Sequence, residues 1–249
     1  MTALDRVLMH PHSVAARVAL AAEWKAAGDP RARLIELQLK TFHGLGPSNW
    51  DRVPDEIDRL LRAHRKEWAE PLLPLVNDYG FELGLVASIN TSGETWVSRG
   101  AEIVRVAPIV SLALDPPLDL QAVARSAALQ NVRSLSLFAG PWLDDEGAEA
   151  LAESPHSKEL RFLHIAGGTI GQRGMQALAR RTDIVSIEVT GNPGASSAPG
   201  RVVVRERTFL VGPVGREILD KAYLDLALRD DGRVSWPPLD SDFFFDNDE

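Results

Sequence analysis

The sequence predicts an α/β protein in which repeated strand–helix units follow a helical N-terminal module. Three observations lead to this prediction: helical periodicity in residues 1–79, short alternating segments from Gly80 onward, and an apolar frame that occurs four times. The chain has 249 residues, of which 45% are hydrophobic, so it can bury the core that such an architecture needs. The expected divisions are a helical module (1–79), a repeat region (80–198), and a C-terminal cap and tail (199–249).

Three helices are expected in the N-terminal module. The first follows Ser13, whose side chain suits an N-cap, and ends before Gly28. The second covers Arg31–Phe42. The third begins at Pro54 and ends before Pro71. Its apolar face is formed by residues at helical spacing: Ile57, Leu60, Leu61, His64 and Trp68.

The repeat frame has apolar residues at its first, fourth and sixth positions. The fourth-position residues are Leu112, Leu135, Leu163 and Ile187, and they are separated by 23, 28 and 24 residues, which is the period of leucine-rich repeats. Alternate residues of a strand point to the same side of a sheet. We therefore expect positions four and six to be buried under helices, and positions three, five and seven to form an open sheet face. Stacked units cover apolar surface that one unit leaves exposed, which gives a short solenoid with a parallel sheet and outer helices.

Three segments resemble a known bacterial family. They are Ala21-x-x-Trp24 with Gly28-Asp29-Pro30-Arg31 and Ile35-x-Leu37-Gln38, the stretch HRKEWAEPLLP (64–74), and the repeat LHIAGGTIGQRGMQALA (163–179). The chain resembles proteins in which a repeat-companion domain precedes leucine-rich repeats of the ribonuclease-inhibitor-like class. The resemblance covers residues 1–193.

The resemblance departs from the family pattern in the turns. The ninth repeat position, usually Asn, is Pro117, Gly140 and Gly168 in the first three frames, and only Asn192 fits in the fourth. What the resemblance implies is a scaffold that binds other proteins, because repeats of this class generally do so. It assigns no particular binding site.

Composition excludes several classes of function. The net charge is −8, and residues 1–79 are neutral, so the acidity lies in the later two thirds of the chain. Nucleic-acid binding needs a basic surface, so we expect no nucleic-acid partner. The absence of cysteine excludes disulfides, thiolate metal sites and a cysteine nucleophile. The chain has neither a visible signal peptide nor a long apolar run, so we expect a cytoplasmic protein without a membrane partner.

Catalytic motifs are also lacking. The sequence contains no HExxH, GxSxG or phosphate-loop pattern, and the glycines of 167–174 fit a strand-to-helix turn. We therefore expect a protein that is not an enzyme and needs no cofactor or metal.

The expected partner-binding residues lie on the open sheet face and in the tail. They are Asp115, Phe138, Phe162, His164 and Glu188 on the face, and Phe243, Phe244 and Phe245 in the tail. Buried aromatic side chains are common anchors of protein interfaces, and the acidic residues would favour a basic protein partner. Three alternatives stay open: another part of the chain covers the face, the tail docks on the body of the protein, or the tail is a disordered, solubilising end.

The predicted function is a non-enzymatic protein–protein interaction module that presents the sheet face of its leucine-rich repeats. One alternative is a cytoplasmic immunity or antitoxin-like protein that neutralises a toxin domain by binding it. Another is an enzyme that uses His164 and Glu188 as an acid–base pair.

Overall fold

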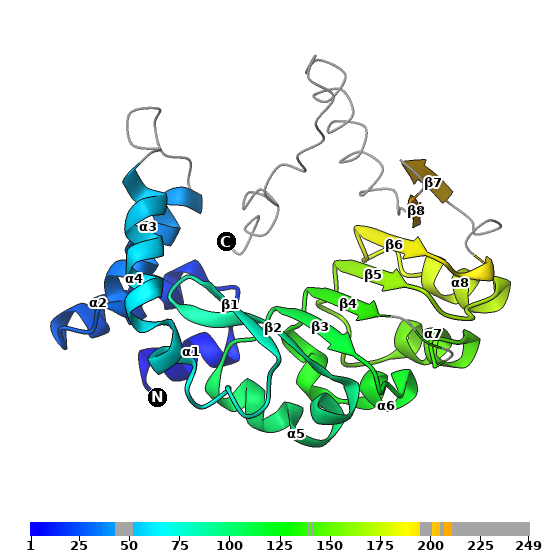
Figure 1. Cartoon of the computed structure of the whole chain (residues 1–249), viewed down its shortest axis with the longest axis horizontal. Helices are drawn as coiled ribbons and strands as arrows, with labels where there is room; N and C mark the ends of the chain where they lie inside the picture. Colours follow the sequence, from blue (N-terminus) through cyan, green and yellow to red (C-terminus); the bar gives the residue numbers. More distant parts are fainter. Residues whose placement is uncertain (43–51, 139, 141, 195–200, 205–206, 211–249) are drawn as a thin grey trace, which may run out of the picture.

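Strands and helices alternate along most of the chain in the computed structural model, which describes residues 1–42, 52–138, 140, 142–194, 201–204 and 207–210 (Figure 1). The strands are β1 (Asp78–Glu82), β2 (Leu85–Ser92), β3 (Ser111–Asp115), β4 (Ser134–Phe138), β5 (Phe162–Ala166), β6 (Ser186–Thr190), β7 (Arg201–Val204) and β8 (Arg207–Leu210). They form one sheet in the order β1-β2-β3-β4-β5-β6-β8-β7. Strands β2 to β6 are parallel, whereas β1, β7 and β8 pair antiparallel with their neighbours. The predicted α/β class is confirmed.

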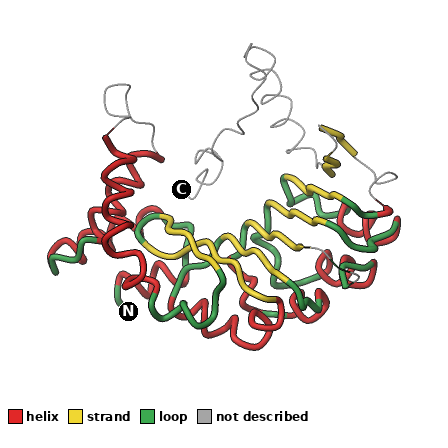
Figure 2. Tube along the Cα trace, in the orientation of Figure 1, coloured by secondary structure: helices red, strands yellow, loops and turns green. Residues whose placement is uncertain are grey.

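The described helices pack at the N-terminal end of the sheet and along one of its sides (Figure 2). They are α1 (Ala3–Met9), α2 (Val14–Ala26), α3 (Arg31–Phe42), α4 (Arg52–Ala69), α5 (Gly93–Val106), α6 (Leu120–Arg125), α7 (Asp145–Glu153), α8 (Gln172–Ala179) and the 3-10 helix η1 (Ala127–Asn131). Helices α5 to α8 follow β2 to β5 in sequence and cover one side of these strands; among the described residues, no helix packs on the opposite side.

The predicted apolar frame is confirmed. Leu112, Leu135, Leu163 and Ile187 lie directly beside one another on neighbouring strands. Each is at most 2% exposed. The first and sixth positions are equally buried: Ile109, Leu114, Val132, Leu137, Leu160, Ile165, Ile184 and Val189. Full burial of one such side chain stabilises the fold by about 1.5–3 kcal/mol, so these rows supply a large part of the core.

A further strand–helix unit, which the sequence analysis missed, precedes the four predicted ones. Ile89 of β2 lies beside Leu112, and Thr91 lies beside Leu114, so β2 has the same frame with threonine at position six. Thr91 is buried, and its hydroxyl donates a 2.7 Å hydrogen bond to the carbonyl oxygen of Leu75. This bond satisfies the polar group that burial would otherwise leave unpaired.

The predicted boundaries of the N-terminal helices are largely confirmed. Helix α2 has Ser13 as its N-cap, with the side chain accepting a hydrogen bond from the Ala16 amide, and α3 has the predicted bounds. Helix α4 begins at Arg52 rather than at Pro54. Helix α1 was not predicted, although Thr2 and Asp5 form a capping box that marks its start.

The Gly-Asp-Pro-Arg segment forms the turn between α2 and α3. Gly28 has a φ of +73°, which reverses the chain after α2. The Asp29 carboxylate accepts hydrogen bonds from the backbone amide and the guanidinium of Arg31. The Arg31 guanidinium lies 4.1 Å from the centre of the Trp24 ring, a cation–π contact between the two helices. The motif therefore fixes the angle of the helical pair.

The end of the same motif attaches the helices to the sheet. The Gln38 side chain donates a 3.0 Å hydrogen bond to the carbonyl oxygen of Phe81 and accepts one of 2.7 Å from the amide of Gly84. Ile35 packs directly on Gly84, where an added Cβ would lie 2.3 Å from Ile35 Cγ1. Helix α3 thus holds the β1–β2 turn through hydrogen bonds and close packing. Strand β1 runs across the predicted boundary between residues 79 and 80.

A buried arginine strengthens this attachment. Arg17 of α2 donates hydrogen bonds to the carbonyl oxygens of Leu83 (3.2 Å) and Pro11 (3.4 Å). Burial lowers the pKa of its guanidinium to about 10, partly opposed by the negative charge of Glu82. Arg17 therefore remains charged at neutral pH and joins the helices to the sheet.

The apolar residues of 202–204 and 209–211 predict one or two strands in the C-terminal region, and this region contains β7 and β8. Strand β8 pairs antiparallel with β6 and so extends the sheet beyond the last parallel strand. The apolar spacing within residues 218–228 also predicts an amphipathic helix. This segment and the tail at 240–249 lie outside the described residues.

Two glycines with similar backbone angles test the contact between α3 and the β1–β2 turn. Gly84 has a φ of +81° and no room for a Cβ, whereas Gly28 has a φ of +73° and nothing within 4 Å of its added Cβ. Gly28→Ala should lower the free energy of unfolding by only about 1–2 kcal/mol, which is the strain of an alanine in the left-handed conformation. Gly84→Ala should cost about 2–5 kcal/mol, because overpacking adds to the same strain. Equal losses in urea unfolding would contradict this account of the contact.

The alternation along β5 is tested by two neighbouring residues. Leu163 points into the core, so Leu163→Ala should lower the free energy of unfolding by about 2–5 kcal/mol. Phe162 is half-buried on the opposite side of the strand, so Phe162→Ala should cost at most about half as much. Chemical denaturation of both variants gives the comparison. A larger loss for Phe162→Ala would show that the inward and outward sides have been exchanged.

Candidate protein-binding face

The side of β2–β6 that faces away from the helices forms a continuous surface, which we call the sheet face. Its side chains are half-buried and alternate with the fully buried frame residues. Its described residues are Ser88, Asn90 and Ser92 of β2, Ser111, Ala113 and Asp115 of β3, Ser134, Ser136 and Phe138 of β4, Phe162, His164 and Ala166 of β5, and Ser186 and Glu188 of β6. Most of them are small, so little side-chain volume rises above the strands.

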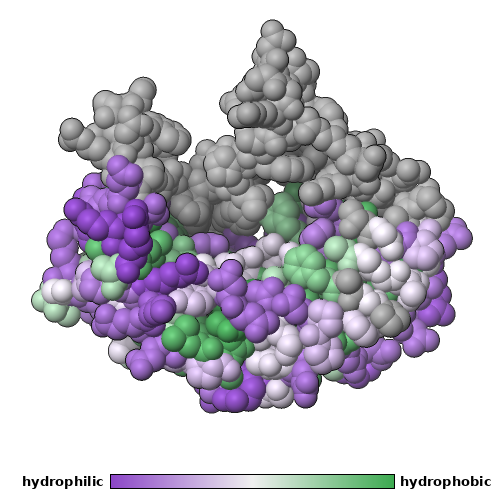
Figure 3. Space-filling model, in the orientation of Figure 1, coloured by the Kyte–Doolittle hydropathy of each residue, from purple (hydrophilic) through white to green (hydrophobic). Residues whose placement is uncertain are grey.

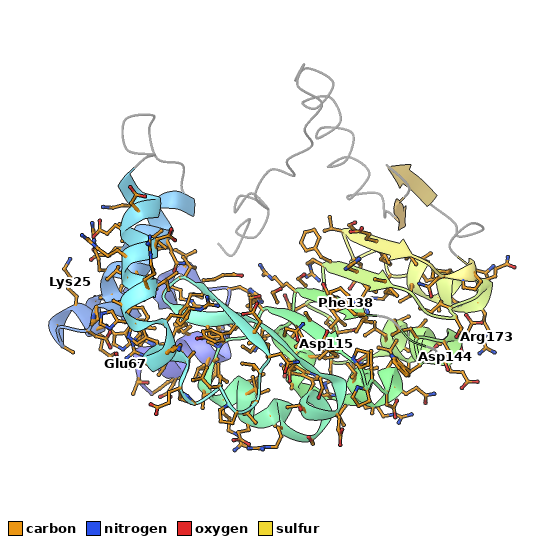
Figure 4. All side chains as sticks on the ribbon, viewed as in Figure 1. Lys25, Glu67, Asp115, Phe138, Asp144 and Arg173 are labelled. Atoms are coloured by element: carbon orange, nitrogen blue, oxygen red, sulfur yellow. The ribbon has the colours of Figure 1, made fainter. Side chains whose placement is uncertain are left out.

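Aromatic side chains gather on β4 and β5. The rings of Phe138 and His164 are 5.7 Å apart and nearly perpendicular, at 79°. Phe162 lies between Ser134 and Ser186 in register, so its ring has small neighbours on both adjacent strands. Apolar surface is visible among polar residues near the middle of the sheet in Figure 3, where Figure 4 labels Phe138. Phe138 and His164 are thus in contact, and Phe162 lies two positions before His164 on the same side of β5; we call these three residues the aromatic group.

Acidic residues lie on both sides of this aromatic group. Glu188 occupies the position beside His164, with Glu188 Oε1 3.9 Å from His164 Nε2. Asp115 ends β3 and accepts a 3.3 Å hydrogen bond from the side-chain amide of Asn77. It follows Leu114, which pairs with Leu137, so Asp115 and Phe138 take neighbouring positions at the carboxyl ends of β3 and β4. The five predicted residues of the sheet face therefore share one surface.

The sheet face is wider than the sequence predicted. Ser88, Asn90 and Ser92 extend it by one strand, because β2 belongs to the parallel sheet. The signal for this strand was present, since Ile89 precedes Leu112 by the same 23-residue spacing. The predicted tail residues Phe243, Phe244 and Phe245 lie outside the described residues.

The glycines of 167–174 lie in the turn between β5 and α8, as predicted, and two of them also contact the preceding strand–helix unit. The amides of Gly171 and Gly174 both donate 2.8 Å hydrogen bonds to the Asp145 carboxylate of the preceding unit. The side-chain oxygen of Asn192 accepts a hydrogen bond from the Ile170 amide, and its side-chain nitrogen donates one to the carbonyl oxygen of Gly167. The polar groups of these turns are thus used within the fold.

Two negative findings concern the described residues only. None of their helices combines the length and apolar character needed to cross a bilayer. No group of three or more histidine, aspartate or glutamate side chains among them is arranged to hold a metal ion.

No protein-family model, no curated protein and no solved structure matches this chain.

A histidine with a strongly shifted pKa lies away from the sheet face. His12, in the turn between α1 and α2, has its Nε2 3.2 Å from the carbonyl oxygen of Asn131. Burial lowers the pKa of His12 to about 3, and the positive charge of Arg133 acts in the same direction. The neutral imidazole therefore joins the helical module to the segment before β4 at physiological pH.

This histidine should make the stability of the fold depend on pH. Its pKa is about 3 in the folded state and about 6.5 in the unfolded state, so between these values the unfolded chain binds the additional proton. The free energy of unfolding should therefore fall as the pH drops from 6.5 toward 3. His12→Gln retains a hydrogen-bond donor without titrating, so its stability should fall less between pH 7 and pH 5. Denaturation at the two pH values, with exposed His10→Gln as the control, measures the difference; equal losses for wild type and His12→Gln would refute it.

Proposed function

We propose that this protein is a non-enzymatic interaction module whose sheet face binds another protein. The observation that carries the proposal is the half-exposed group formed by Phe138, Phe162 and His164 on a rigid sheet. Aromatic side chains bury large areas at little cost in conformational entropy, and they are frequent hot spots of protein interfaces. Serines occupy the positions beside Phe162 on both adjacent strands, so the neighbouring side chains are small.

The charges of the face define the chemistry of the partner. The outward positions of β2–β6 contain two acidic residues, Asp115 and Glu188, and neither lysine nor arginine. A partner segment with one or more basic residues beside an apolar side chain would complement this pattern. Charges at such a rim mainly set the association rate and the choice of partner.

The size of the face indicates how the partner must bind. Five parallel strands at about 4.8 Å spacing, each about 16 Å long, cover roughly 400 Å². A protein interface of standard size buries about 800 Å² on each partner. The partner must therefore extend beyond the strands onto neighbouring loops or helices.

We also propose that the strand–helix units are leucine-rich repeats of the ribonuclease-inhibitor-like class, preceded by a repeat-companion-like module. The equal spacing of Ile89, Leu112 and Leu135, at 23 residues, supports this proposal. So does the use of the Gly28–Gln38 motif, which joins the helices to the first hairpin. Such a module would cover the exposed end of a repeat stack, as solenoids require.

A second candidate function rests on the 3.9 Å approach of His164 and Glu188. A histidine beside a carboxylate can serve as a general base, so an acid–base enzyme would use this pair. His164→Ala would abolish such an activity by removing the base. If the purified protein has an activity and the His164→Ala variant retains all of it, this candidate is eliminated.

The proposed binding function predicts the effect of removing one aromatic ring. Phe162→Ala should weaken binding of the protein partner by about 1–3 kcal/mol, or roughly 5- to 150-fold in Kd. Partners are captured from the native cell with the wild-type chain, identified by mass spectrometry and titrated in purified form by calorimetry. A small basic toxin domain among them would favour the immunity-protein alternative.

The control for this experiment is Leu73→Ala, which shortens an exposed apolar side chain outside the sheet face. It should leave affinity unchanged. A partner that binds Phe162→Ala and wild type equally well, with both proteins folded, would refute the assignment of the sheet face.

A further inference from the structure

A second surface of different chemistry lies between α4 and β1. It is an open pocket of about 380 Å³, which we call the α4–β1 pocket. Its lining residues are Asp58, Leu61, Arg62, Arg65, Tyr79, Gly80 and Phe81. The volume falls in the range of pockets that hold ligands of a few side chains in size.

The charged residues that line this pocket are two arginines, Arg62 and Arg65, and one carboxylate, Asp58. Residues 59–66 of α4 contain Arg59, Arg62, Arg65 and Lys66 and no acidic residue. The side chains of Arg62 and Arg65 are 79% and 48% exposed. Arg62 lies 3.7 Å from Asp58 and Arg65 lies 3.4 Å from Asp78, but exposed ion pairs of this kind contribute only about 0–1 kcal/mol each. Arg65 also donates a 2.7 Å hydrogen bond to the carbonyl oxygen of Tyr79. The ion pairs of Arg62 and Arg65 with carboxylates can therefore be exchanged for carboxylates of a ligand while this hydrogen bond is kept. Hydrophilic surface covers this end of the molecule in Figure 3.

The floor of the pocket is aromatic. The rings of Tyr79 and Phe81 are 6.1 Å apart and steeply inclined, and the Trp68 ring lies 6.0 Å from Phe81. The Arg65 guanidinium lies 4.6 Å from the centre of the Tyr79 ring. Tyr79 and Phe81 line the pocket and are half-buried, so they offer apolar surface to a ligand, and Trp68 packs behind Phe81. A matching ligand carries aromatic side chains next to negative charges.

One segment of the chain has this composition. Asp240–Glu249 contains three consecutive phenylalanines, five acidic residues and no basic residue. We propose that the α4–β1 pocket binds this acidic-aromatic tail of the same chain, with a phenylalanine on the aromatic floor and carboxylates at Arg62 and Arg65. The acidic residues of the sheet face would repel the tail, which favours the pocket over that surface.

The length of chain before the tail permits this contact. Strand β8 is separated from β1 by six strand spacings, about 29 Å in total. The 29 residues between Leu210 and Asp240 can span up to about 100 Å when extended. A tethered segment also reaches its site at an effective concentration in the millimolar range, so modest intrinsic affinity is enough to hold it.

The absence of cysteine makes a cross-linking test specific. Asp58→Cys at the pocket and Asn247→Cys in the tail are introduced together into the full chain, and formation of the intrachain disulfide is followed during mild oxidation. The control pair combines Asn247→Cys with Glu146→Cys on α7, because the side chains of Asp58 and Glu146 are equally exposed, at 67%. The pair that includes residue 58 should form its intrachain disulfide at least tenfold faster.

Charge reversal tests the chemistry of the contact. Arg62→Glu should slow formation of the intrachain disulfide between residues 58 and 247 at least tenfold. The control is Arg173→Glu, which reverses the charge of an exposed arginine on α8 and should leave this rate unchanged. Equal rates for the two cysteine pairs would overturn the proposal. Disulfides formed only between chains, or a rate insensitive to Arg62→Glu, would overturn it as well.

Discussion

The in-register stacking of apolar side chains across the parallel strands is the constraint on which this structure depends. Leu112, Leu135, Leu163 and Ile187 form one continuous buried row, and each residue covers apolar surface of its neighbour. Because side chains alternate along a strand, this row also determines which residues face outward. A shift of one residue in any strand would bury serines and a histidine and expose leucines. The core and the sheet face are therefore two consequences of the same register.

The N-terminal helices hold the first edge of the sheet in place through contacts with the β1–β2 hairpin. Gln38 holds the β1–β2 turn through its amide, Arg17 holds it through the Leu83 carbonyl, and Ile35 fills the space above Gly84. Two of these residues bond backbone groups of the hairpin, and the third packs on its glycine. The N-terminal helices and the first strands consequently belong to one packed structure, and the sheet face begins beside them.

Much of the fold was predictable because the repeat frame tolerates little variation at buried positions. Strand β2 was missed because threonine occupies position six, and its burial depends on a hydrogen bond to the Leu75 carbonyl that no local pattern reveals. The clustering of Phe138, His164 and Glu188 followed from the frame, whereas the exposed fraction of their side chains required the structure. The α4–β1 pocket was not predictable at all, since Tyr79 and Phe81 meet Arg62 and Arg65 only after the hairpin folds back on α4.

The hydrogen bonds from Gly171 and Gly174 to Asp145 have a consequence for how such a chain can change. The side chain of Asp144 caps helix α7 from within the same unit. The amides at the start of α8 instead donate to the Asp145 carboxylate of the preceding unit. Excising the α7 unit, or inserting a new one after it, would separate α8 from that carboxylate and leave two amides without their acceptor. Gene duplication or recombination within this array would thus be confined to joints that keep the two units together as a pair.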